Sequence, residues 1–219
     1  MRAKARVAVR IAGNNVAAQR FRAAALYAGV PLELDIHPSA RVSGRIVIQL
    51  WGWGNTPIRL RIGEGAIVEP GVVFRLTDGA DVTIGPLSLI RRGVVLNASG
   101  TLTLVRQNMI SWYSTIHCAG SVVLGDQTGL SEQATIVDST HYRTTPDKYG
   151  YENTLISHVA IGDRCWIAAK AAVLHGVEIG DDVVVAAGSV VTKNLPVGVL
   201  AGGIPARVLA ENYSGAPGS

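Results

Sequence analysis

The stretch IGDRCWIAAKAAVLHGVEIGDDVVVAAGSVV, residues 161–191, decides the fold, because an aliphatic residue returns at every sixth position. The series is Ile161, Ile167, Val173, Ile179, Val185 and Val191. A period of six fits neither an α-helix nor a simply alternating strand. It suits a short flat strand, a corner and another strand, so that three sides close one triangular coil. Such coils stack as parallel strands about 4.8 Å apart, with the recurring residues in a dry interior.

The same spacing continues toward the N-terminus in five earlier triplets. They are Ile36, Val42, Ile48; Ile62, Val68, Phe74; Ile84, Ile90, Leu96; Leu104, Ile110, Ile116; and Leu124, Leu130, Ile136. A small or β-branched residue stands four positions after most of these residues, with Ile46 and Asn108 as exceptions. Several triplets open with an aliphatic residue and glycine, as at Ile161-Gly162. We expect this glycine to supply the backbone geometry of a sharp corner.

The composition agrees with a β-rich globular chain. Of 219 residues, 48% are hydrophobic, only 5% are aromatic, and 25 are glycine. A disordered chain is excluded, because a domain of this size buries roughly 70% of its unfolded surface and this one has the apolar content to do so. We therefore expect one main domain made of many short strands and tight turns.

The chain lacks the signs of a membrane or disulfide-bonded protein. No stretch approaches about 18 uninterrupted apolar residues, which a membrane span needs. Polar residues such as Asn14 and Arg20 interrupt any signal-peptide core, so we expect a cytoplasmic protein. Cys118 and Cys165 are too few for a disulfide framework and lack zinc-site spacing, which indicates reduced thiols.

The net charge of +4 is concentrated at the N-terminus. The basic residues before position 30, where no acid occurs, are Arg2, Lys4, Arg6, Arg10, Arg20 and Arg22. A solvated helix face explains them most simply, and contact with an anionic lipid or polymer is the alternative. Nucleic-acid binding is not expected, because the rest of the chain has no basic face interleaved with aromatic residues.

The pattern divides the chain into parts. Residues 1–30 are predicted to form a basic helical segment ended by Pro31, and residues 31–209 the β-helix. Corner insertions are expected at 51–57 and 78–81. Residues 137–160 interrupt the regular coils as a polar loop, where function usually lies on a rigid scaffold. Residues 210–219 are expected to form a flexible tail.

Three motifs follow one another in the last coils. They are the pair Trp166-Ile167, the run AGSVVTK at 187–193 and the sequence GIPAR at 203–207. Together they resemble the hexapeptide-repeat O-acetyltransferases that act on sugars, capsular polysaccharides and xenobiotics. The resemblance covers about Ile36 to Leu209 and implies a left-handed parallel β-helix.

The resemblance also implies a homotrimer that binds acetyl coenzyme A, without a metal, in the groove between neighbouring subunits. Carried over by position, the cofactor contacts fall on Trp166, Ala169, Ala187, Thr192, Lys193 and Arg207. Small residues allow the pantetheine arm to lie against backbone, and cationic groups face phosphate oxygens. As an alternative, the two alanines are plain corner residues and the lysine is solvated.

The same resemblance places the catalytic histidine shortly after the last interior residue of the preceding coil, which is His141 here. A neutral imidazole can remove the proton of a sugar hydroxyl as that hydroxyl attacks the thioester. Asp138 is a candidate to orient the imidazole ring. A turn residue that caps its own loop is the alternative for Asp138.

The acceptor is predicted only by class. Relatives that act on simple galactosides place an asparagine and an aspartate where this chain has Ser111 and Ala119, so a galactoside is not carried over. Trp112, Tyr113 and His117 stand nearby, and aromatic faces stack on pyranose rings. A cell-surface glycan or its precursor fits better, with the basic N-terminus as a peripheral contact to the inner membrane face. The alternative for Trp112 is a corner filler or a subunit contact.

Two other functions remain open. A γ-carbonic-anhydrase-like metal site would use the same scaffold, but the spacing of His117, His141 and His158 does not match that family. A non-enzymatic binding or assembly solenoid would have regular corners and no cofactor motifs. His37, His158 and His175 are interpreted as corner or loop-end residues.

Overall fold

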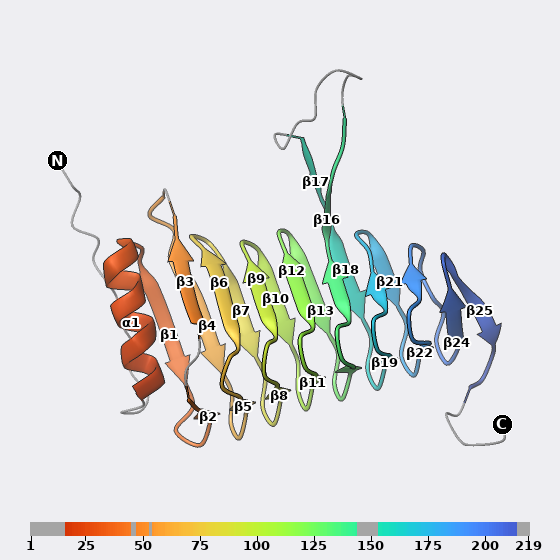
Figure 1. Ribbon diagram of the computed structural model, residues 1–219, viewed down its shortest axis with the longest axis horizontal. Coiled ribbons are helices and arrows are strands. Elements are labelled where there is room, and N and C mark those ends of the chain that lie inside the picture. Colours follow the sequence, from red (N-terminus) through yellow and green to blue (C-terminus); the bar gives the residue numbers. More distant parts are fainter. Residues whose placement is uncertain (1–15, 45–46, 53, 144–152, 214–219) are drawn as a thin grey trace.

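The computed structural model describes residues 16–44, 47–52, 54–143 and 153–213. In this part of the chain a helix precedes a parallel β-helix whose three sides we name sheets A, B and C (Figure 1). The all-β, left-handed β-helix predicted from the spacing and the resemblance is confirmed. Residues 1–15, which carry Arg2, Lys4, Arg6 and Arg10, lie outside the described residues, as do Ile46 and the end of the tail.

Each of the first seven coils gives one strand to each sheet, and sheet B also contains β24 and β25, which pair antiparallel with each other. Sheet A contains β1 (Leu32–Ile36), β4 (Ile58–Ile62), β7 (Asp81–Ile84), β10 (Thr101–Leu104), β13 (Ser121–Leu124), β18 (His158–Ile161) and β21 (Val177–Ile179). Sheet B contains β2 (Arg41–Val42), β5 (Ile67–Val68), β8 (Leu89–Ile90), β11 (Met109–Ile110), β14 (Gly129–Leu130), β19 (Trp166–Ile167), β22 (Val184–Val185), β24 (Leu200–Gly203) and β25 (Ala206–Ala210). Sheet C contains β3 (Val47–Trp51), β6 (Val73–Thr77), β9 (Val95–Ala98), β12 (Thr115–Cys118), β15 (Thr135–Val137), β20 (Ala172–Val173) and β23 (Val190–Val191).

The predicted interior residues form continuous ladders down the core. In sheet A the register partners run Ile36, Ile62, Ile84, Leu104, Leu124, Ile161 and Ile179, each at most 4% exposed. Sheets B and C continue the other two series, whose first members Val42 and Ile48 are half-buried and whose later members are buried. The exception Asn108 is also buried, because its amide donates to the carbonyls of Gly125 and Thr128. The six-residue period therefore predicted the buried ladders, except at Val42 and Ile48 in the first coil.

The aliphatic-glycine corners have a different cause from the one expected. Gly125 and Gly162 do not have a positive φ, which instead falls on Gln127 and Arg164 two residues later. The corner is tight because Asp163 Oδ1 accepts the Asp126 N–H of the preceding coil at 2.7 Å. A Cβ at Gly125 would collide with that carboxylate oxygen. Glycine is thus required for close approach between coils.

The helix α1 (Val16–Ala28) covers the N-terminal end of the coils (Figure 1). Phe21 is fully buried and meets Phe74 edge to face, with ring centroids 5.1 Å apart. The helix ends at Ala28, where Gly29 takes the left-handed conformation, two residues before Pro31. The helix is thereby packed onto the solenoid core.

We expect Phe21→Leu to lower the free energy of unfolding by about 1 kcal/mol, because it removes the aromatic pair with Phe74. Tyr27, which is 96% exposed on the same helix, provides the matched control Tyr27→Leu. Chemical denaturation should leave that control within about 0.5 kcal/mol of the wild type. Equal stability of both variants would mean that α1 does not pack on the core.

The predicted loop at 137–160 is more regular than expected. β15 ends at Val137 and β18 begins at His158, so residues 138–157 leave the coil. Within them β16 (Ser139–His141) pairs antiparallel with β17 (Thr154–Ile156), and the pair projects from the solenoid as an arm (Figure 1). Smaller insertions occur at the same edge, between β3 and β4 and between β6 and β7, as predicted.

Candidate active site

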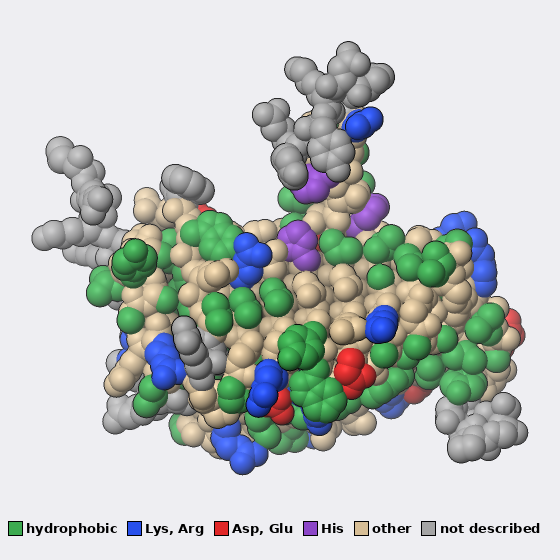
Figure 2. All heavy atoms as spheres, in the orientation of Figure 1, with side chains coloured by type: hydrophobic (Ala, Val, Ile, Leu, Met, Phe, Trp, Pro, Cys, Tyr) green, Lys and Arg blue, Asp and Glu red, His purple; other side chains and the backbone are tan. Residues whose placement is uncertain are grey.

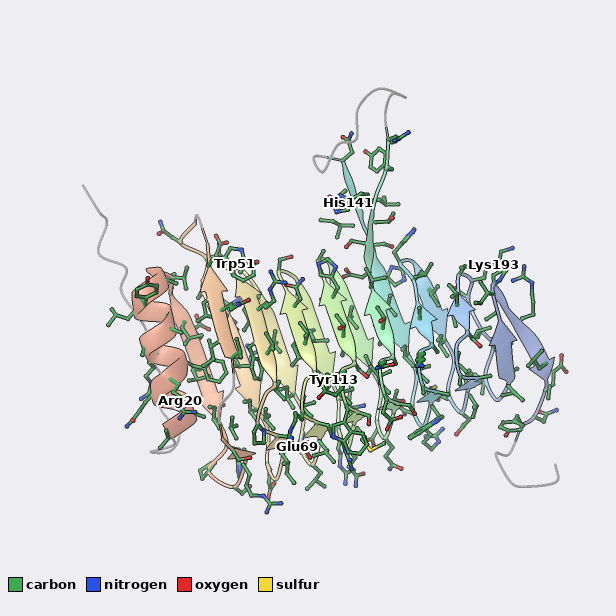
Figure 3. The ribbon with its side chains drawn as sticks, viewed as in Figure 1. Arg20, Trp51, Glu69, Tyr113, His141 and Lys193 are labelled. Carbon is green, nitrogen blue, oxygen red and sulfur yellow. The ribbon has the colours of Figure 1, made fainter. Side chains whose placement is uncertain are left out.

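His141 lies on the arm, at the end of β16. Its Nδ1 is 3.2 Å from the hydroxyl of Thr154, its register partner on β17. The imidazole is exposed to solvent. Figure 3 shows it on the arm, above the edge where the arm leaves the coils. An exposed imidazole on a two-stranded support can meet a substrate from outside the chain.

Asp138 anchors the arm to the solenoid. Its side chain is fully buried, and its two carboxylate oxygens accept the backbone N–H groups of Ala119 and Gly120 at 2.8 and 2.7 Å. The backbone of Asp138 also closes the base of the arm, since its carbonyl accepts the N–H of Ser157. These contacts cap a corner of the preceding coil, an arrangement that neither sequence-based interpretation of Asp138 described.

We expect Asp138→Asn to lower the free energy of unfolding by roughly 2 kcal/mol, because one charged acceptor of a buried N–H is replaced by an amide NH₂ that cannot accept. Urea denaturation measures this loss. The substitution Thr140→Val, at a half-buried neighbouring position, leaves the carboxylate in place and provides the control. If Asp138→Asn kept wild-type stability but lost turnover, Asp138 would act on the reaction and not on the arm.

The cysteines do not provide a nucleophile. Cys118 is buried beside Asp138, and burial together with that carboxylate raises the pKa of its thiol to about 12. Burial also raises the pKa of the Cys165 thiol. Both thiols therefore stay protonated at neutral pH, and no disulfide joins them.

A second group of predicted residues lies at the corner between sheets B and C. Successive corners are joined there by backbone hydrogen bonds, for example from Gly188 N–H to the Ala169 carbonyl at 2.9 Å. Trp112, Ala169 and Ala187 occupy equivalent places in this stack. The Arg91 guanidinium lies 4.3 Å from the centroid of the Trp112 ring, and the Tyr113 ring covers Gly93.

The structure separates these two groups. Figure 3 shows His141 and Lys193 at the upper edge and Tyr113 in the lower half of the solenoid, away from them. Within one chain, sheet C therefore stands between the arm and the corner that carries Ala169 and Ala187. The sequence-predicted residues do not form one cleft in a single chain.

The remaining predicted residues lie on the C-terminal coils. Trp166 projects from the outer face of sheet B and lies over Gly129. Thr192 and Lys193 follow β23 and are exposed, at the same edge as the arm. Arg207 lies on β25, where its guanidinium donates to the Ala206 carbonyl at 2.9 Å.

His117 lies on the coil that precedes the arm. It is half-buried on the outer face of β12 and pairs in register with Val137, immediately before Asp138. Figure 2 shows histidine side chains gathered on and below the base of the arm. His158 pairs with Glu178 at 3.1 Å, and His37 contacts the Ser39 hydroxyl at a corner, as expected of loop-end and corner residues.

The residues that the structure describes contain neither a cluster of metal ligands nor a membrane-spanning helix. Among them, no three His, Cys, Asp or Glu side chains lie close enough together to hold a metal ion. Nor does any helix in this part of the chain have the length and apolarity to cross a bilayer.

Comparisons with known proteins agree with this geometry. Residues 158–193 match the family described as bacterial transferase hexapeptide (six repeats). A galactoside O-acetyltransferase of Escherichia coli K12 is 30% identical to this chain. The matched region covers 68% of this chain and 63% of that relative. A putative colanic acid biosynthesis acetyltransferase of the same organism is 31% identical, over 74% of this chain and 76% of the relative.

Solved structures share the fold. A polysialic acid O-acetyltransferase superposes with a TM-score of 0.66 at 22% identity, covering 83% of this chain and 86% of its own. An N-acyltransferase from Bacillus cereus, solved with dTDP and coenzyme A, gives a TM-score of 0.60 at 18% identity over 70% of this chain and 84% of its own.

Proposed function

Since this chain belongs to the bacterial hexapeptide-repeat acetyltransferases, we propose that it transfers an acetyl group from acetyl coenzyme A to a hydroxyl of a sugar or cell-surface glycan. The observation that carries the proposal is His141, an exposed imidazole on an arm that Asp138 anchors to the rigid coils. Related proteins named for galactoside and colanic acid acetylation support the acceptor class.

The reaction we propose is direct. His141 takes the proton from the acceptor hydroxyl while the hydroxyl oxygen attacks the thioester carbonyl. The tetrahedral centre then collapses, the carbon–sulfur bond breaks, and the imidazolium returns its proton to the leaving thiolate. The acetyl ester and free coenzyme A result, and no acyl-enzyme forms. Positioning of the two substrates contributes much of the rate gain.

The donor is proposed to lie along the corner between sheets B and C. Ala169 and Ala187 present small side chains there, which allow a pantetheine arm to approach the backbone. Arg207 is exposed on β25 of sheet B and can face phosphate oxygens. Lys193 is exposed at the same edge as the arm, so we propose that it faces the phosphates of a donor held by a neighbouring copy. Trp166 and Thr192 complete the proposed set.

We propose that the site forms between two subunits of a homotrimer. The donor corner lies where the sheet C strands begin, and the arm that carries His141 leaves where they end. A second copy is therefore needed to bring the two together. Apolar side chains also flank that corner on both outer faces, which favours burial against another subunit. On sheet B they include Ile67, Leu89 and Met109, and on sheet C Val73, Val95 and Val190.

A screen of acceptors tests the function. Acetyl coenzyme A is mixed with galactosides, with partial hydrolysates of colanic acid and polysialic acid, and with antibiotics, and thiol release is followed. We expect release only with a hydroxyl-bearing sugar, whose product carries a new acetyl ester by mass spectrometry. Release equal to the number of enzyme sites without any acceptor would contradict direct transfer. Absence of transfer to every sugar would contradict the proposed acceptor class.

We expect His117→Ala to raise the KM for the acceptor with a milder loss of kcat, because His117 lies beside the arm and contributes binding but not proton transfer. Steady-state kinetics with the acceptor from the screen measure both constants. A kcat loss as large as that of the His141 variant would instead make His117 the base.

The outward face of α1 suggests where in the cell the protein acts. The helix α1 presents Arg20, Leu26 and Tyr27 outward, a combination of a cation and apolar groups that suits a bilayer surface. We propose a cytoplasmic enzyme whose basic N-terminus contacts the inner membrane face, near lipid-linked sugars.

A further inference from the structure

The outer face of sheet C carries a row of four polar side chains that leads to the arm. The row consists of Gln49, Arg75, Asn97 and His117, which are successive register partners on β3, β6, β9 and β12. The next partner, Val137, immediately precedes the arm. Because neighbouring strands lie about 4.8 Å apart, the row spans on the order of 14 Å.

These side chains have no hydrogen-bond partner of their own. In the part of the chain that the structure describes, none of the four makes a side-chain hydrogen bond or an ion pair. The two outward arginines of β4 on sheet A differ, because Arg59 pairs with Glu33 at 2.9 Å and Arg61 pairs with Asp81. The row on sheet C therefore keeps its donors and acceptors available for a ligand.

An aromatic side chain stands at the far end of the row. Trp51 is 38% exposed, and the Arg75 guanidinium lies 5.6 Å from the centroid of its ring. Figure 3 shows Trp51 and His141 along the same edge of the molecule. An indole face can stack on the apolar face of a pyranose ring, while amide, guanidinium and imidazole groups bind its hydroxyls.

We propose that Trp51, Gln49, Arg75, Asn97 and His117, the acceptor row, bind an extended glycan of several sugar units and deliver one unit to His141. This inference rests on the proposed function and narrows its acceptor to an oligomeric or polymeric glycan. The strand spacing is close to the length that one pyranose unit adds to an extended chain. Successive units can thus meet successive coils.

The row and the donor corner lie on different coils. The donor corner belongs to the C-terminal coils, whereas the row occupies the N-terminal coils and reaches the arm from the other side. A glycan on the row of one copy and a coenzyme on the donor corner of a neighbouring copy would approach the arm without sharing residues. The residues two positions earlier on the same strands, such as Val73 and Val95, are apolar and bind no sugar hydroxyl.

The test compares acceptors of different length. The glycan that accepts acetyl in the screen is used as its single sugar unit and as size-fractionated oligomers of up to six units. The readout is the ratio of kcat/KM for the six-unit and one-unit acceptors, because loss of folded enzyme lowers both values equally. We expect a wild-type ratio of at least about 10, since several additional hydrogen bonds and a stacking contact form.

The double variant Arg75→Ala/Asn97→Ala should reduce this ratio to nearly 1. The control Arg61→Ala removes an exposed arginine from the same coil on sheet A and should keep the wild-type ratio. A wild-type ratio near 1, or a double variant that keeps the full ratio, would overturn the acceptor row. Such a result would leave acetyl transfer itself standing, whereas failure of every sugar in the screen would remove the proposed function.

Discussion

His141→Ala is expected to lose between about 100- and 10,000-fold in kcat, the range for removal of one general base. The imidazole is exposed on the arm, so its truncation should change the free energy of unfolding by about 0.5 kcal/mol or less. Acetyl coenzyme A should still bind, because the proposed donor residues lie on other coils. Thiol release measures kcat, and calorimetry measures the binding of acetyl coenzyme A, so a loss of catalysis can be distinguished from a loss of donor binding.

His37→Ala is the matched control for this variant. His37 is an exposed histidine held by Ser39 at a corner of the first coil. We expect its replacement to leave kcat unchanged. If His141→Ala turned over normally as well, the imidazole on the arm would have no catalytic role, although the donor-binding proposal would remain.

Ala187→Glu is expected to raise the KM for acetyl coenzyme A on the order of 100-fold, corresponding to about 3 kcal/mol of binding free energy. The new side chain would occupy the space proposed for the pantetheine arm and would repel the phosphates of the coenzyme. Ala187 is exposed, so folding should not suffer.

The control Ala23→Glu makes the same substitution at an exposed position on α1. It should leave the donor KM at the wild-type value. A normal donor KM in Ala187→Glu would mean that the coenzyme does not lie along this corner, and Ala187 would then be a plain corner residue.

The core was predictable because the coil imposes a strict spacing. Each interior residue repeats six positions later, so Ile161, Ile167 and Val173 could be assigned to three sheets before any contact was known. The reason for Gly125 was not predictable in this way. It depends on Asp163, 38 residues later, whose position follows from how the coils stack.

The sequence located the interruption of the coils that carries His141, but not the strand pairing and hydrogen bonds that hold it. The position of His141 after Ile136 placed it in the right interruption of the coils, yet the antiparallel pairing of β16 with β17 left no periodic signal. Asp138 was expected to serve His141 or its own turn. Its carboxylate accepts the N–H groups of Ala119 and Gly120, which are backbone groups that no residue pattern reveals.

The acceptor row was missed for a related reason. Gln49, Arg75 and Asn97 are separated by more than 20 residues each, and unequal insertions between the early coils hide their alignment. Counting along the sheet C strands from Phe74 and Leu96 would have found them, since each row residue directly follows an interior residue.

The central claim is that acetyl transfer occurs between subunits, with His141 from one copy and the donor corner from another. Mixing His141→Ala with Ala187→Glu protein, followed by subunit exchange, tests it most directly. Sedimentation first establishes that the chains form mixed trimers. In a 1:1 random mixture about one quarter of the sites combine an intact His141 with an intact Ala187, so about one quarter of the wild-type activity should return. Mixed trimers that stay as inactive as either parent, or chains that sediment as monomers, would contradict the shared site.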